Sequence, residues 1–198
     1  MIEFIDVTKY YPNKIGINKV NFKIEDNDIV IFCGANGSGK TTTIKLILGL
    51  LKLKGKDEGK IINTFDKMSY IPERIALPTY ISGEDFIKDL LVLQNNKVDY
   101  LNYFSYLDLD PKQIIGTYSK GMRQKLGIIQ AIISKCKCIV LDEPLSGLDS
   151  ESQKKVLKLI TNLKNEKTII ISTHYKELFM DIKTKIIFFE AGSSSEIL

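Results

Sequence analysis

The sequence predicts an α/β fold with a mostly parallel β-sheet. Three largely apolar runs have the length and composition of strands that are buried on both faces: Ile29–Cys33, Lys137–Glu143 and Thr168–His174. Segments with the apolar spacing of amphipathic helices separate these runs, and this alternation is typical of α/β proteins with a parallel sheet. A glycine-rich segment, Gly34–Thr42, follows the first run directly. We therefore expect the sheet to be organised around this segment.

The segment Gly34–Thr42 fits the phosphate-binding pattern G-x-x-x-x-G-K-[ST]. Its glycines allow backbone N–H groups to turn inward around a phosphate, and the start of the following helix adds its positive dipole end. Lys40 is expected to reach the outer phosphates, and the Thr41 hydroxyl is expected to bind Mg²⁺. The sequence therefore predicts a nucleoside triphosphate site made of Gly34, Asn36, Gly37, Ser38, Gly39, Lys40, Thr41 and Thr42.

The composition restricts the class of protein. The 198 residues suffice for one domain with a substantial core, and the 44% of hydrophobic residues excludes a disordered chain. The net charge of +4 comes with lysines scattered along the chain, so we expect a solvated surface and no nucleic-acid partner. Cys33, Cys136 and Cys138 form no C-x-x-C pair and accompany a single histidine, which argues against a zinc site.

The sequence gives a further expectation about membranes. Residues 1–4 lack the basic and apolar regions of a secretion signal. No apolar run approaches the roughly 20 residues that a membrane-spanning helix needs. We therefore expect the chain to be soluble by itself.

Residues 1–75 and 126–198 are expected to form the core of one domain, and residues 76–125 an inserted α-helical subdomain in which Ser82 caps a helix. The N-terminal strands predict an antiparallel β region. Residues 191–198 are expected to be a short serine-rich tail.

Polar side chains stand at the ends of the later strands. Asp142 and Glu143 end a core strand on opposite sides of the pleat, so one can hold Mg²⁺ through water while the other faces a nucleophilic water. His174 follows the next strand, at the edge where α/β sheets bind ligands. These positions predict a metal-binding role for Asp142 and catalytic roles for Glu143 and His174.

Two further segments have the composition of a helix start and a turn. Ser119 and Gly121 open a helix and form a second potential anion site, although a capped helix explains them equally. Ser146–Asp149 is a turn that leads into an amphipathic helix.

Together, these motifs resemble the nucleotide-binding subunit of an ABC transporter, a P-loop NTPase, over nearly the whole chain. Gly34–Thr41 resembles the Walker A loop, and Cys138–Glu143 resembles Walker B with its catalytic glutamate. Tyr118–Met122 is similar to a degenerate form of the signature Leu-Ser-Gly-Gly-Gln, and Ser146–Asp149 resembles the D-loop. His174 resembles the switch histidine. Tyr11 resembles the aromatic residue that stacks on the base, and Tyr10 is the competing choice.

The resemblance implies a mechanism. Two such subunits pack head to tail. Each ATP lies between the Walker motifs of one subunit and the signature of the other. Ser119 and Gly121 of the signature and Asp149 of the D-loop belong to this nucleotide site. Lys40 holds phosphates, and Mg²⁺ is bound by Thr41, Asp142 and Glu73. Glu143 polarises the attacking water, and His174 contacts the γ-phosphate.

Three residues depart from the family pattern. Glu73 stands where the family usually has the Q-loop glutamine, and Lys120 and Met122 replace two residues of the signature. The sequence Gly-Met-Arg-Gln in the signature resembles exporters whose membrane subunit is a separate chain.

The resemblance also implies partners and a location. A second ATPase subunit is expected, as a homodimer or a heterodimer, and a separate transmembrane permease is expected to dock on the helical subdomain and Q-loop. The chain would then be cytoplasmic and peripheral on the cytoplasmic face of the membrane. The alternative is a soluble ABC ATPase that acts as an assembly scaffold, and a small-molecule kinase is a more distant alternative because it explains neither the signature nor the D-loop.

Overall fold

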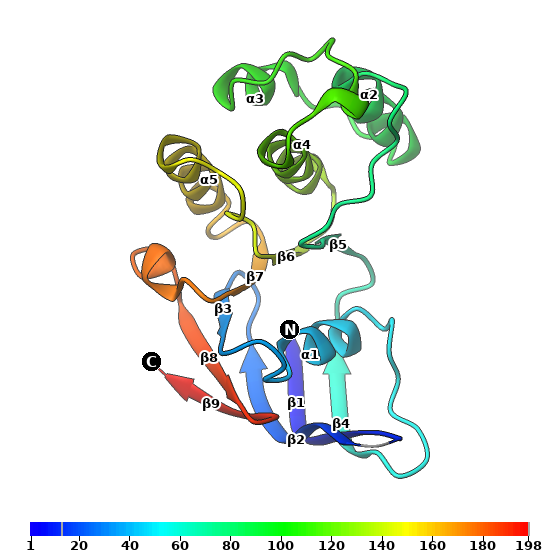
Figure 1. Ribbon diagram of the computed structural model, residues 1–198. Coiled ribbons are helices and arrows are strands. Elements are labelled where there is room, and N and C mark those ends of the chain that lie inside the picture. Colours follow the sequence, from blue (N-terminus) through cyan, green and yellow to red (C-terminus); the bar gives the residue numbers. More distant parts are fainter. Residues whose placement is uncertain (13, 198) are drawn as a thin grey trace. The chain divides into compact units, whose positions relative to one another are not determined.

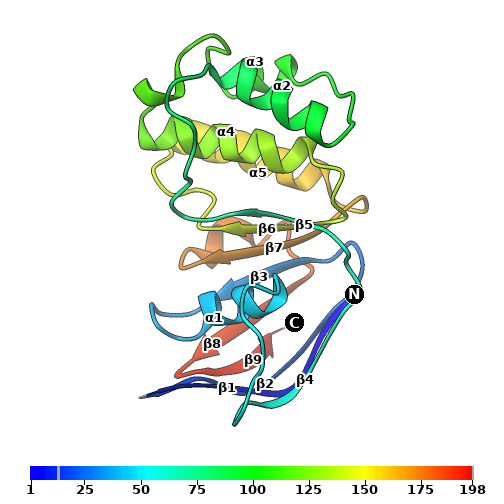
Figure 2. The same ribbon diagram turned by 90° about the vertical axis from the view of Figure 1, so that its right-hand side faces the viewer.

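The structure is a computed structural model that describes residues 1–12 and 14–197 (Figures 1 and 2). The chain forms two compact units. The first consists of residues 1–68, 137–140 and 164–198, and the second of residues 69–136 and 141–163.

An antiparallel sheet in the first unit confirms the predicted N-terminal β region. Its strands, in the order β2-β1-β4, are β1 (Ile2–Tyr11), β2 (Lys14–Ile24) and β4 (Glu58–Asn63). Ile2, Phe4 and Val7 of β1 are buried. Asp6 and Lys19 have positive φ angles of 48° and 46° and lie where the register between β1 and β2 shifts. These irregularities bend the sheet locally.

The parallel sheet of the first unit is built around β3 (Ile29–Cys33). Its two neighbours, β7 (Thr168–Thr173) and β8 (Lys185–Glu190), run parallel to it. The next strand beyond β7 is β6 (Cys138–Asp142), of which residues 138–140 belong to the first unit and residues 141–142 to the second. Every residue of β3 and β7 is buried, because strands inside a parallel sheet are covered on both faces. Helix α1 (Lys40–Ile47) follows β3, and a 3₁₀ turn, η2 (Lys176–Phe179), follows β7. The predicted α/β fold with a mostly parallel sheet is thus confirmed.

The expectation of a C-terminal tail is wrong. Ser193–Ile197 form strand β9, which pairs antiparallel with β8. Ala191 and Gly192, with φ angles of 47° and 86°, make the two-residue connection, which matches a hairpin turn with positive φ at both positions. Serine has no strong strand preference, so the composition of this segment gave no strand signal; pairing with β8 is a non-local effect. Leu198 lies outside the described residues.

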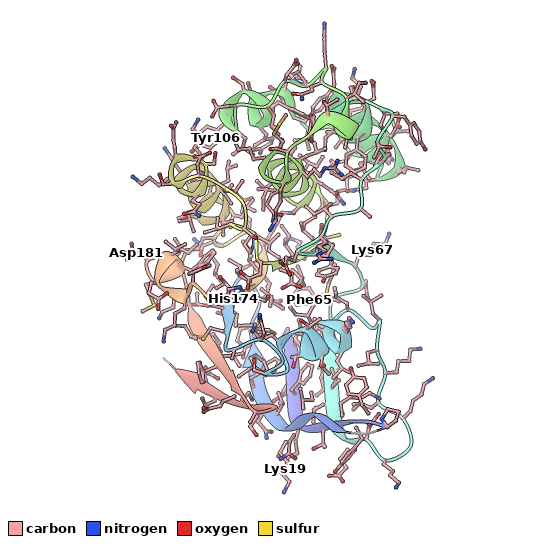
Figure 3. The ribbon with its side chains drawn as sticks, in the orientation of Figure 1. Lys19, Phe65, Lys67, Tyr106, His174 and Asp181 are labelled. Atoms are coloured by element: carbon pink, nitrogen blue, oxygen red, sulfur yellow. The ribbon has the colours of Figure 1, made fainter. Side chains whose placement is uncertain are left out.

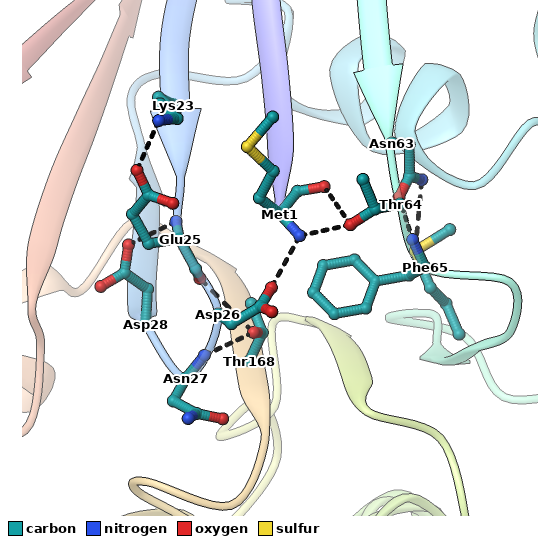
Figure 4. Close-up of polar contacts among 11 residues, drawn as sticks. Met1, Lys23, Glu25, Asp26, Asn27, Asp28, Asn63, Thr64, Phe65 and Thr168 are labelled. Atoms are coloured by element: carbon teal, nitrogen blue, oxygen red, sulfur yellow. Dashed lines mark hydrogen bonds and ion pairs between the residues drawn. The ribbon is translucent and has the colours of Figure 1, made fainter.

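Polar contacts fix the start of the N-terminal sheet next to the parallel sheet (Figure 4). The Met1 amino group donates to Asp26 Oδ1 and to Thr64 Oγ1, both at 2.6 Å. The backbone N–H of Asn27 donates to Thr168 Oγ1 at 2.8 Å. Residues 26–27, which lead into β3, therefore form hydrogen bonds with Met1, at the start of the antiparallel sheet, and with Thr168 of the parallel sheet.

Helices dominate the second unit (Figure 2). Its elements are β5 (Met68–Ile71), which begins one residue before it, α2 (Gly83–Leu93), α3 (Leu101–Tyr106), η1 (Ile115–Thr117), α4 (Lys120–Ile133) and α5 (Ser150–Asn162). Ser82 caps α2 as expected, because its Oγ accepts a hydrogen bond from the Asp85 N–H at 3.1 Å. The division into a core and an insertion at residues 76–125 stays a prediction. Within the described residues, no helix combines the length and apolar character required to cross a membrane.

Candidate nucleotide site

The loop between β3 and α1 has a backbone that requires glycine. Gly34, Gly37 and Gly39 have φ angles of 143°, 80° and 116°, a region that residues with a side chain rarely adopt. A Cβ atom on Gly34 would lie only 2.2 Å from the carbonyl oxygen of Phe189. The glycines therefore let the loop curl tightly against the sheet, as a phosphate cradle requires.

Lys40 is held at the centre of this loop. Its side chain is buried, and Nζ donates to the carbonyl oxygens of Gly34 at 2.6 Å and Ala35 at 3.0 Å. Lys40 is also the first residue of α1, so its ammonium group lies within the loop at the positive end of the helix. This arrangement favours an anion with several oxygens at the mouth of the loop.

Ser38 provides a buried hydroxyl in the same loop. Its side chain is 5% exposed, and Oγ has no hydrogen-bond partner among the residues that the structure describes. An unpaired buried hydroxyl costs about 1–3 kcal/mol, so a phosphate oxygen that accepts from Ser38 would remove this cost. The Thr41 side chain is exposed at the start of α1, where a hydroxyl suits Mg²⁺. The loop residues thus fit a magnesium–triphosphate ligand.

Tyr11, rather than Tyr10, lies next to the loop helix. The Tyr11 hydroxyl is 3.5 Å from Thr42 Oγ1. Its ring lies over Gly16, where a Cβ atom would be 2.5 Å from Tyr11 Cε2. The backbone N–H of Tyr10 instead donates to Asp57 Oδ1 at 2.8 Å, and its ring is 37% exposed. Of the two competing residues, Tyr11 therefore has the position that suits contact with a bound nucleotide.

His174 directly follows β7 and is exposed (Figure 3). In the parallel pairing of β3 with β7, Cys33 and Thr173 are register partners. The next residues, Gly34 and His174, therefore leave neighbouring strands at the same edge of the sheet. The first unit thus brings together the loop, Lys40, Thr41, Tyr11 and His174.

The predicted acidic residues belong to the second unit. Asp142 ends β6, and the Tyr70 hydroxyl donates to its Oδ2 at 3.5 Å. Burial and the neighbouring Asp142 carboxylate raise the pKa of Tyr70 to about 12, so this hydroxyl stays a donor at neutral pH. Glu143 is 7% exposed and has a φ angle of 50°, which is uncommon for a residue with a side chain. Such backbone strain clusters at functional sites.

The signature residues and the D-loop turn contact each other in the second unit. Ser119 caps α4 by accepting from the Met122 N–H at 3.2 Å. A Cβ atom on Gly121 would lie 2.7 Å from the carbonyl oxygen of Gly147. Asp149 caps α5, and the hydrogen bond from the Ser152 backbone lowers the pKa of its carboxyl group.

Glu73 is exposed and lies on a cavity of about 480 Å³. The cavity is also lined by Arg74, Ile75, Lys120, Arg123 and Gln124. In the described part of the chain, no group of three histidine, cysteine or acidic residues could hold a metal ion by itself. The ligand set Thr41, Asp142 and Glu73 therefore stays a prediction.

Sequence reasoning missed two residues of the second unit that contact predicted motifs. Tyr70 gave no signal, because its contact with Asp142 joins positions 72 residues apart. Lys120 appeared only as a departure from the family pattern, and its contacts with the D-loop turn could not be read from the sequence.

Comparison with known sequences and structures identifies the family. The sequence model described as "ABC transporter" matches residues 17–146. The zinc import ATP-binding protein ZnuC of Rickettsia bellii is 36% identical over 187 residues, which cover 92% of this chain and 79% of that protein. The bacitracin transport ATP-binding protein BcrA of Bacillus licheniformis is 33% identical over 190 residues, which cover 88% of this chain and 61% of that protein.

Solved structures share the fold over the whole chain. An ATP-binding subunit of an ABC transporter superimposes with a TM-score of 0.85 at 22% identity and covers 100% of this chain and 89% of that one. A dimeric ATP-binding cassette in a post-hydrolysis state, bound to ADP and phosphate, superimposes with a TM-score of 0.82 at 21% identity. The superposition covers 100% of this chain and 98% of that one. The family match includes the glycine loop and reaches the D-loop turn. The chain therefore belongs to the ABC transporter family, as one of its ATPases.

Proposed function

We propose that the chain is the ATP-binding and ATP-hydrolysing subunit that powers an ABC exporter whose membrane subunit is a separate chain. The observation that carries this proposal is the glycine loop, in which Lys40 is buried and the buried Ser38 hydroxyl has no partner among the described residues. Both groups suit the phosphates of ATP. The export direction is supported by the exporter-like sequence Gly121–Gln124.

Each site residue then has a chemical role. Lys40 and the loop amides bind the phosphates, and Tyr11 stacks on the base. Thr41 and Asp142 would hold Mg²⁺, with Glu73 contributing an oxygen, and the metal ion neutralises phosphate charge. Glu143 would polarise the attacking water, and His174 would contact the γ-phosphate.

The active form is proposed to be a head-to-tail dimer. Ser119, Gly121 and Asp149 would act on the nucleotide that is bound by the loop of the other subunit. The start of α4 suits this role, because the first N–H groups of a helix have no partner within it and its N-terminus is the positive end of the helix dipole. One chain carries all of these residues, so a homodimer would have two complete sites, and a heterodimer is the alternative.

The cavity beside Glu73 supports docking of a membrane partner. Arg74, Lys120 and Arg123 give it a basic lining, and Gln124 adds a buried amide nitrogen that has no partner among the described residues. A partner segment could satisfy this amide. Docking there would place the chain on the cytoplasmic face of the membrane.

Purification from detergent-solubilised membranes tests the transport role. A tagged chain should retain an integral membrane protein at a stoichiometric ratio, and the ATPase rate of the complex should respond to that subunit. The variant Arg123→Glu, which reverses a charge in the cavity, should lose the membrane protein, whereas Lys158→Glu on the exposed face of α5 should retain it. Retention of soluble proteins alone would favour the scaffold function instead.

A further inference from the structure

Lys120 is the first residue of α4 and reaches the D-loop turn, Ser146–Asp149. Its Nζ donates a hydrogen bond to Ser146 Oγ at 2.7 Å. The family signature usually has glycine here, which could make no such bond. The lysine therefore adds a contact that a glycine at this position could not make.

The stem of Lys120 also packs on the turn. A Cβ atom on Gly147 would lie 3.0 Å from Cδ and 3.2 Å from Cγ of Lys120. Gly147 has a φ angle of 77°, which glycine adopts readily. The lysine stem occupies the space that a side chain at position 147 would need. Lys120 therefore contacts the turn twice: its stem packs on Gly147, and its ammonium group donates a hydrogen bond to Ser146.

The turn connects Lys120 to the backbone of Glu143. The N–H of Ser146, whose hydroxyl accepts from Lys120, donates to the carbonyl oxygen of Glu143 at 3.1 Å. The far end of the turn is fixed separately, because Asp149 Oδ1 accepts from the Ser152 N–H at 2.8 Å. Glu143 is held with a positive φ angle of 50°, so the neighbouring contacts must maintain an unusual backbone.

We propose that Lys120 is a positioning residue that fixes the Ser146–Asp149 turn and, through Ser146, the backbone of Glu143. This inference rests on the proposed role of Glu143 as the residue that polarises water. The lysine acts through its contacts with Ser146 and Gly147 of the turn. Its effect should therefore appear in the hydrolysis step and leave ATP binding unchanged.

A double-mutant cycle tests this connection. Lys120→Met keeps most of the stem on Gly147 but removes the ammonium group, and Ser146→Ala removes the acceptor. Each variant should lower kcat by about 2- to 10-fold, the range expected for one hydrogen bond, with KM for ATP unchanged. The double variant should be no slower than the slower single variant, because both substitutions remove the same contact. Lys120→Arg, which keeps a donor and a positive charge, should recover part of the rate.

Two controls separate positioning from a general loss of structure. Lys154→Met removes an exposed lysine from α5 in the same unit and should leave kcat unchanged. Hydrogen exchange should become faster at the amides of residues 146–148 in Lys120→Met, while exchange in α2 and the melting temperature stay near their wild-type values.

The inference and the proposed function fail in different ways. Wild-type kcat in both single variants, or strictly additive losses in the double variant, would overturn the role of Lys120 even if Glu143→Gln is inactive. If Glu143→Gln hydrolyses ATP at the normal rate, the proposed function of Glu143 fails first, and the inference fails with it.

Discussion

Cys33 and Thr173 are register partners in the parallel pairing of β3 with β7. Both strands therefore end at the same edge of the sheet, where α/β proteins bind ligands. The glycine loop and His174 follow these two strand ends and start from adjacent positions. This relationship supports contact between His174 and the terminal phosphate of a nucleotide in the loop.

His174→Ala should therefore lower kcat by about 10²–10³-fold, as expected when one group that stabilises the transition state is removed. Binding of ATP should change little, because the loop and Lys40 remain. The matched control is Tyr175→Phe, which keeps the ring whose centroid lies 5.5 Å from that of His174. Steady-state kinetics with both variants measure this, and an unchanged kcat in His174→Ala would contradict the assignment.

A second prediction concerns the composite site. Ser119→Arg should bind ATP but not hydrolyse it, because the substitution damages only the site of the other subunit. Lys40→Ala should lose ATP binding in its own loop. Mixing the two inactive variants should restore partial ATPase activity, because one of the two sites in a mixed dimer avoids both substitutions. Inactive mixtures at every ratio, with mixed dimers confirmed, would show that the start of α4 has a structural role only.

A third prediction concerns Glu73, which adds a negative charge where glutamine is usual. The carboxylate should strengthen Mg²⁺ binding and repel a metal-free triphosphate. ATP affinity should therefore rise more steeply with Mg²⁺ concentration in the wild type than in Glu73→Gln. Titration of a non-hydrolysable ATP analogue at several Mg²⁺ concentrations measures this, and superimposable curves would remove Glu73 from the metal site.

The contact between Tyr70 and Asp142 gives a fourth prediction. Tyr70→Phe removes only the hydroxyl that donates to Asp142, so the Mg²⁺ concentration that half-saturates nucleotide binding should rise by about 2- to 10-fold. Tyr100→Phe is a matched control, because the Tyr100 hydroxyl also donates to a carboxylate, Glu84, at 3.3 Å. Equal Mg²⁺ dependence in the two variants would mean that Tyr70 does not orient Asp142.

The sequence was most informative where the chemistry depends on local patterns. The buried strand, the glycine loop and Lys40 are neighbours in the chain, so their pattern alone predicted the loop. Capping residues such as Ser82 are also local, and the structure confirms this cap.

The sequence was least informative where contacts join distant segments. Strand β9 forms only because β8 offers an edge for pairing, and its serines gave no strand signal. The bond between Lys120 and Ser146 spans 26 residues. The positive φ angle of Glu143 depends on the surrounding fold, so it too could not be read from residue types.

In the proposed function, ATP joins two copies of this chain and Glu143 polarises the water that hydrolyses it. Glu143→Gln should bind ATP normally but lose about 10²–10⁴-fold in turnover, because removal of a general base typically has this effect. The uncleaved ATP should then hold the dimer together. The most direct measurement is the molar mass of Glu143→Gln by gel filtration with light scattering, with and without Mg-ATP. Glu143→Gln should be a dimer with Mg-ATP and a monomer without it. A variant that stays monomeric with Mg-ATP and hydrolyses ATP at the wild-type rate would show that Glu143 does not activate the water and that ATP does not join the subunits.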